Sequence, residues 1–131
     1  MPEEFDRRRI LVVDDEEILR VVARAALEQA GYVVLEAEDS ASALEVFQRE
    51  RERIAAVLLD VNMPGRTGDE FFQDLRGVDP TVSVIFCSGS ISDKKGALLI
   101  RAGAKAFLHK PYSARQLTEA VRQVLQPQPK R

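Results

Sequence analysis

Five short apolar runs alternate along the chain with five longer stretches whose apolar residues recur at helical spacing. The first such stretch has apolar residues at positions 19, 22, 23, 26, 27 and 30, which is the spacing of one buried helix face. Strands that alternate with single helices require right-handed crossovers. We therefore predict an α/β fold with a doubly wound, five-stranded parallel sheet and helices on both faces. The expected strands lie at 10–13, 33–35, 54–59, 82–87 and 106–108.

The ends of the helices also carry sequence signals. Gly31 stands where a left-handed residue would end the first helix. Asp39 or Ser40 could cap the second, and the pair Ser113 and Gln116 forms a capping-box pattern before the last. The charged run 48–53 is interpreted as an exposed helix end and loop.

Composition narrows the class of protein. A chain of 131 residues with 45% apolar residues has the size and core of one ordinary domain. The net charge of −2 shows no basic excess, so we expect no direct binding of nucleic acid. We expect no membrane span and no signal peptide, and hence a cytoplasmic protein. The one cysteine, Cys87, lies in an apolar run and is expected to be a small buried hydrophobe.

Polar residues follow four of the five apolar runs at the point where each strand is expected to end. Asp14 and Asp15 follow the first run, Asp60 the third, Ser88 the fourth and Lys110 the fifth. In a parallel sheet these carboxyl ends meet at one edge, where ligands bind. Because a carboxylate at a buried strand end is costly without a partner, the set predicts a built site for a divalent cation and a phosphoryl group.

The four motifs in this order resemble the receiver (CheY-like) domain of bacterial response regulators. The resemblance covers residues 9–125, and leaves 1–8 as an N-terminal extension and 126–131 as a tail or linker. It implies a flavodoxin-like sheet with strand order 2-1-3-4-5. Ser88 replaces the commoner threonine and keeps the hydroxyl, while Thr67 and Gly68 stand where Asp-Gly is usual.

The resemblance implies a division of labour at the strand ends. Asp60 would be the phosphoacceptor, and Asp15 and Asp60 would ligate Mg²⁺ together with the backbone carbonyl of Asn62. Asp14 would act through a bound water, and Lys110 would pair with the phosphoryl oxygens. Clustered carboxylates need a cation to stay ionised together, and Mg²⁺ prefers oxygen ligands, so the roles are chemically consistent.

A switch is implied by the same family. Ser88 would move toward the phosphoryl group and vacate space for Phe107, whose rotamer would report activation. Asn62 and Ser90 would tune the rate of dephosphorylation. The bond between Lys110 and Pro111 would be cis. His109, the only histidine, is expected to lie on the surface rather than act in catalysis.

The implied function is a phosphorylation-dependent signalling switch rather than a true enzyme. The phosphodonor would be a histidine kinase or a histidine phosphotransfer protein. A downstream protein would read the face made by the fourth helix, the fifth strand and the fifth helix. The chain would be a monomer or a weak phosphorylation-dependent dimer, either standing alone or cut from a larger protein.

Three alternatives remain to be tested. A phosphatase with an aspartyl nucleophile needs a second acid two residues after it, where this chain has Asn62. A flavodoxin-like cofactor binder needs Ser, Thr or Gly after the first strand to cradle a phosphate, where this chain has the acidic residues 14–17. A degenerate receiver would signal without phosphorylation, which the intact acidic set argues against.

Overall fold

The fold is a five-stranded parallel sheet in a computed structural model that describes residues 9–63, 65–89 and 93–125. The strand order is β2-β1-β3-β4-β5, which confirms the predicted order 2-1-3-4-5. All neighbouring strands are paired in parallel. The strands are β1 (Arg9–Val13), β2 (Val33–Ala37), β3 (Ile54–Asp60), β4 (Val84–Ser88) and β5 (Ala106–His109).

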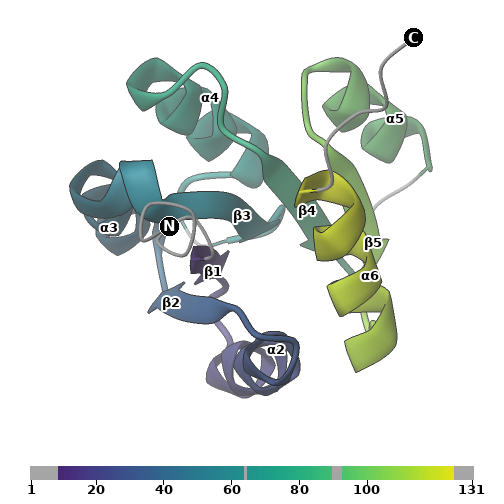
Figure 1. The fold of residues 1–131 in the computed structure, drawn as a ribbon. Helices are drawn as coiled ribbons and strands as arrows, with labels where there is room; N and C mark the ends of the chain where they lie inside the picture. Colours follow the sequence, from purple (N-terminus) through teal and green to yellow (C-terminus); the bar gives the residue numbers. More distant parts are fainter. Residues whose placement is uncertain (1–8, 64, 90–92, 126–131) are drawn as a thin grey trace, which may run out of the picture.

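Helices cover both faces of this sheet (Figure 1). One hydrophobic cluster packs α3, α4 and α5 against one face, and a second packs α2 and α6 against the other. Successive strand residues point to opposite faces, so Ile10 belongs to the second cluster and Leu11 to the first. The helices are α2 (Glu17–Gln29), α3 (Ser40–Glu50), α4 (Gly68–Val78), α5 (Asp93–Arg101) and α6 (Ala114–Leu125), with a short 3₁₀ helix η1 (Arg51–Arg53) after α3.

The helix ends follow the sequence signals. Gly31 has φ 100° just after α2, the left-handed conformation that favours glycine. Asp39 caps α3, because its carboxylate accepts a hydrogen bond from the Ser42 N–H at 2.8 Å. Ser113 and Gln116 form the predicted capping box before α6, with reciprocal bonds of 3.0 and 2.8 Å.

Two local features go beyond the sequence prediction. The strand predicted at 82–87 begins only at Val84, because the Val82 N–H instead closes a turn onto the carbonyl of Asp79. The charged run at the end of α3 is exposed in large part as expected, but its last three residues form η1.

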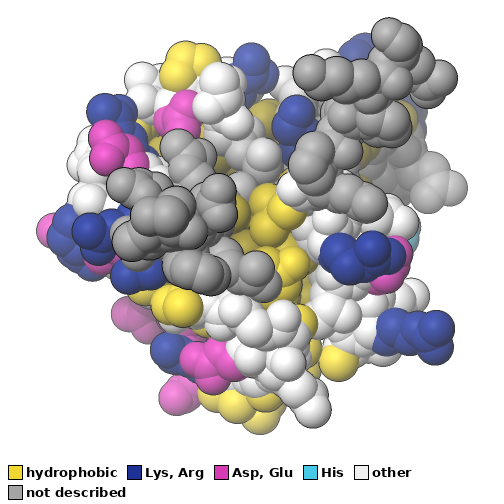
Figure 2. Space-filling model, viewed as in Figure 1, with side chains coloured by type: hydrophobic (Ala, Val, Ile, Leu, Met, Phe, Trp, Pro, Cys, Tyr) yellow, Lys and Arg dark blue, Asp and Glu magenta, His cyan; other side chains and the backbone are white. Residues whose placement is uncertain are grey.

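The surface in Figure 2 carries acidic and basic side chains intermixed. No helix in the described ranges is long and apolar enough to cross a membrane. Binding to nucleic acid and cytoplasmic location are not tested by these features and stay predictions. The predicted extension 1–8 and tail 126–131 lie outside the described residues, so the domain boundaries also stay a prediction.

Candidate functional site

The polar residues of the strand ends meet at the carboxyl edge of the sheet. Asp60 and Ser88 are the last residues of β3 and β4, and Asp14 and Lys110 directly follow β1 and β5. Asp14, Asp60 and Ser88 are almost completely buried, with exposed fractions of 3%, 4% and 0%. The topology thus brings together side chains that are up to 96 residues apart in the chain.

Lys110 joins the two buried carboxylates. Its Nζ donates to Oδ2 of Asp14 at 2.8 Å and to Oδ2 of Asp60 at 3.0 Å. It also lies 3.8 Å from a carboxylate oxygen of the more exposed Glu16. Since the side chain of Lys110 is only 12% exposed, these charge-assisted bonds compensate for much of its desolvation.

Burial and pairing shift the pKa values of the central groups. Burial raises the pKa of the Asp60 carboxyl, and the opposing effects of the Asn62 N–H and Lys110 do not cancel it. Burial by itself lowers the pKa of Lys110, but the hydrogen bonds to Asp14 and Asp60 outweigh it and raise the pKa. Lys110 is therefore a permanent cation at neutral pH beside a carboxylate whose charge is costly.

The segment after β3 positions both the Asp60 carboxylate and the neighbouring Ser88 side chain. The Asn62 N–H donates to Oδ1 of Asp60 at 2.9 Å, and the Asn62 side-chain amide donates to Oγ of Ser88 at 3.0 Å. Gly68, the first residue of α4, donates from its N–H to the carbonyl of Val61 at 2.8 Å. A Cβ on Gly68 would lie 2.7 Å from Cα of Val61, so only glycine lets α4 begin this close.

Three carboxylates at this edge could hold a metal ion. One oxygen each from Asp14, Asp15 and Asp60 lies within 4.8 Å of the others, and Asp15 is exposed to solvent. Hard divalent cations prefer carboxylate oxygens, and Mg²⁺ keeps several waters, which an exposed ligand permits. The donor set therefore fits Mg²⁺.

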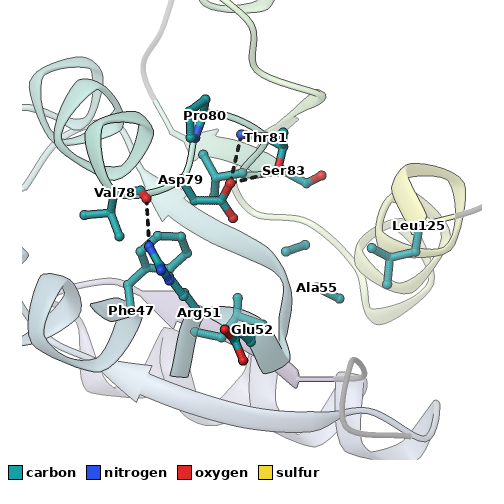
Figure 3. A pocket seen from close by; sticks show the side chains of 13 residues that line it. Phe47, Arg51, Glu52, Ala55, Val78, Asp79, Pro80, Thr81, Ser83 and Leu125 are labelled. Carbon is teal, nitrogen blue, oxygen red and sulfur yellow. Dashed lines mark hydrogen bonds between the residues drawn. The ribbon is translucent and has the colours of Figure 1, made fainter. Parts of the chain in front are cut away.

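A hollow of about 680 Å³ lies at the opposite, amino-terminal edge of the sheet (Figure 3). Some of its polar groups bond to one another: Asp79 accepts from Thr81, and Arg51 donates to the carbonyl of Val78 at 3.0 Å. None of the acidic strand-end residues is among the described residues that line it. The chemistry therefore concentrates at the other edge.

Comparison with known families agrees with the site. A family model of the response regulator receiver domain matches residues 10–122. The chain belongs to this family. Receiver domains are signalling domains rather than classical enzymes, and they generally use Mg²⁺ at an acidic pocket. They interact with kinases and with downstream effectors.

The relatives of this chain include a protein of similar length and a much longer one. Protein CcdB of Bacillus subtilis is 34% identical over 89% of this chain and 97% of its own length. The sensor kinase CckA of Brucella abortus is 34% identical over 91% of this chain but only 13% of its own length. The solution structure of the beryllofluoride-activated NtrC4 receiver domain dimer shares 30% identity with a TM-score of 0.84, covering 90% of this chain and 96% of that one.

The structure brings together most of the residues predicted for the receiver site. Asp14, Asp60, Ser88 and Lys110 converge with Asp15 and Asn62, as described above. The bond between Lys110 and Pro111 is cis, as predicted. Ser90, the second predicted tuning residue, lies outside the described residues. The roles themselves are taken up as proposals below.

Phe107 lies on β5, away from the carboxylates. It is half-buried, and its ring lies against α5, where a Cβ added to Gly96 would be 3.4 Å from it. The ring centroid of His109 is 4.8 Å away, with the two planes at 78°. His109 is exposed, as predicted, so the pair lies at the surface between α5 and the sheet edge.

The sequence interpretation missed two residues of this site. Arg20 on α2 donates to the backbone carbonyl of Asp14 at 2.6 Å, and Gly68 permits the close approach of α4. Arg20 carried a weak signal, since it lies six residues after Asp14 on a helix that starts at the site. Gly68 was read only as part of a departure from the family pattern of small consequence, whereas its contacts with Val61 make it essential to the geometry.

Proposed function

We propose that Asp60 accepts a phosphoryl group from a histidine kinase or a histidine phosphotransfer protein, in a reaction that requires Mg²⁺. The single observation that carries the proposal is that Asp60 belongs to a cluster of three carboxylates and also accepts a hydrogen bond from the ammonium of Lys110. Its Oδ2 is bound by Lys110 and its Oδ1 by the Asn62 N–H, so the nucleophile is oriented without a further base.

The reaction transfers a phosphoryl group from a histidine nitrogen of the donor to a carboxylate oxygen of Asp60. A carboxylate oxygen of Asp60 attacks phosphorus while the bond from phosphorus to the donor's histidine nitrogen breaks, and that nitrogen keeps the electron pair. Asp15, Asp60 and the carbonyl of Asn62 would hold the metal, and Asp14 would act on it through a water. When bound, Mg²⁺ neutralises charge on the transferring oxygens.

Lys110 also neutralises negative charge on the transferring phosphoryl oxygens. Before transfer its ammonium is shared between Asp14 and Asp60. After transfer it pairs with the phosphoryl oxygens, where a fixed cation in a buried site stabilises developing negative charge. The raised pKa of Lys110 keeps it protonated throughout.

The output is a change of surface. Ser88 accepts a hydrogen bond from the Asn62 amide, and a phosphoryl group on Asp60 offers its hydroxyl a new acceptor. Movement of Ser88 then vacates space for Phe107, and Asn62 and Ser90 tune how fast the phosphoryl group is lost. The face of α5, β5 and α6 is the part that a downstream protein reads.

Exposed apolar side chains support this choice of face. Leu98 and Ile100 on α5 are 51% and 44% exposed, and the Phe107 ring of β5 lies against Gly96 of the same helix. The related NtrC4 receiver is a dimer when activated by beryllofluoride. We propose that this chain is a monomer, or a weak dimer once phosphorylated.

Labelling tests the proposal. The protein is incubated with acetyl phosphate and Mg²⁺, and the phosphoryl group is located by mass spectrometry. We expect one phosphoryl group on Asp60, none in Asp60→Asn, and none after removal of the metal by EDTA. Asp74→Asn, which removes a partly exposed carboxylate paired with Arg66, is the matched control and should be labelled normally. Equal labelling of Asp60→Asn would disprove the assignment.

A further inference from the structure

Arg20 links the acidic edge of the site to the outer strand of the sheet. It lies on α2, and its side chain is only 13% exposed. One nitrogen, Nη1, donates to the backbone carbonyl of Asp14 at 2.6 Å, while Nε donates to Oε1 of Glu36 on β2 at 3.1 Å. The two ends of one guanidinium therefore contact two different elements, and the fork is rigid and planar.

This contact completes the bonding of the backbone at Asp14. The N–H of Asp14 donates to the carbonyl of Ala37 at the end of β2, and its carbonyl accepts from Arg20. The carbonyl bound by Arg20 belongs to the peptide group that joins Asp14 to Asp15. Among the described residues, the Asp15 side chain has no hydrogen bond or ion pair, so this backbone is what fixes the point from which its carboxylate extends.

Glu36 is itself held from two sides. Its second oxygen accepts a short hydrogen bond from Arg24, one turn further along α2. Arg24 also pairs with Glu28 at 3.0 Å and reaches the carbonyl of Val34 at 3.3 Å. Among the described residues it makes no hydrogen bond or ion pair with Asp14 or Asp15. Glu36 is thus shared by two arginines, one on each oxygen, and Arg20 is the one that carries the link on to the Asp14 carbonyl.

We propose that Arg20 is a positioning residue for the metal-binding carboxylates, and that Glu36 holds it in place. The inference rests on the proposed function of the site, because it assigns Arg20 a role in the affinity for Mg²⁺. Residues that orient metal ligands without touching the metal typically contribute about 10-fold to 100-fold in affinity. Arg20 acts here through the peptide group between Asp14 and Asp15.

The test is a titration of the full chain with MgCl₂, in which NMR spectra monitor the backbone amide resonances of the site. We expect Arg20→Ala to weaken Mg²⁺ affinity by about tenfold. Arg20→Lys keeps the charge but has a single ammonium that cannot span both acceptors, so it should weaken affinity severalfold. Arg24→Ala is the matched control, since it removes an arginine from the same helix and the same carboxylate, and should bind within about twofold of the wild type.

The outcomes distinguish the role of Arg20 from the proposed binding of Mg²⁺ by the site. A wild type that fails to bind Mg²⁺ would overturn the proposed function itself. A wild type that binds, with Arg20→Ala of equal affinity, would overturn only the role of Arg20. The same holds if Arg20→Lys matches the wild type or if Arg24→Ala weakens binding as much as Arg20→Ala, because either result indicates a charge effect. Should Arg20→Ala not fold, as judged by its amide spectrum without metal, Arg20→Lys carries the test.

Discussion

Lys110 donates to Asp60 at 3.0 Å, so the proposed nucleophile and the permanent cation of the site are in direct contact before any phosphoryl group arrives. The contact explains how a carboxylate that is 4% exposed stays at the end of a central strand. It does not remove the whole cost of burial, since the pKa of Asp60 remains raised above that of an ordinary carboxyl. Burial of the Asp60 carboxylate, the proposed phosphoacceptor, therefore lowers the free energy of unfolding.

Asp60→Asn should therefore raise the free energy of unfolding at pH 7. Burial raises the folded-state pKa of Asp60, so its ionised form destabilises the native state. The cost is absent below the ordinary carboxyl pKa and grows as pH rises from there through the raised folded pKa. Urea unfolding of both proteins between pH 3 and 7 should show curves that diverge with increasing pH. A variant that is less stable at pH 7 than the wild type contradicts this account.

Gly68→Ala and Gly77→Ala form a matched pair at the two ends of α4. A Cβ on Gly68 would lie 2.7 Å from the Val61 backbone, which cannot yield as a flexible side chain would. We expect Gly68→Ala to lower the free energy of unfolding by about 1–3 kcal/mol and to weaken labelling of Asp60. A Cβ on Gly77 meets nothing within 4 Å, so Gly77→Ala should stabilise by about 0.5–1 kcal/mol. Equal effects of the two changes would refute the steric explanation.

Cys87 should be inert in the folded protein. Burial raises the pKa of its thiol from 9.0 to about 12, so that very little of it is the reactive thiolate at pH 8.5. Iodoacetamide should therefore modify the native protein far more slowly than the same protein in urea. Because the folded pKa is raised, the thiol also lowers stability as pH increases from about 9 toward 12, and Cys87→Ala should reduce that loss. Rapid alkylation of the native protein would show that Cys87 is accessible.

The fold follows from patterns that act locally. Continuous apolar runs, helical spacing and caps such as Asp39 and Ser113 determine strands and helices within short windows, which is why the elements and most of their ends could be predicted. The sheet order was implied by the family resemblance rather than by these local patterns. The convergence of Asp14, Asp60 and Lys110 could also be predicted, because carboxyl ends of parallel strands must meet.

Contacts that depend on tertiary distance could not be predicted. The place of Arg20 six residues after Asp14 is only a weak signal that its guanidinium reaches back to the Asp14 carbonyl, because the contact also depends on the position of Glu36 on another strand. The need for glycine at position 68 likewise arises only when α4 packs against the segment after Asp60. Such residues were missed because their neighbours are distant in the chain.

The most direct measurement of the proposed switch uses the ring of His109, the only histidine in the chain. Its centroid lies 4.8 Å from that of Phe107, so movement of Phe107 changes the ring current at the imidazole. Beryllofluoride with Mg²⁺ mimics a phosphoryl group on Asp60, and NMR follows the imidazole resonances. We predict a clear shift in the wild type, and none in Asp60→Asn. An imidazole signal that stays unchanged in wild-type protein saturated with beryllofluoride would contradict the coupling of Asp60 to the surface.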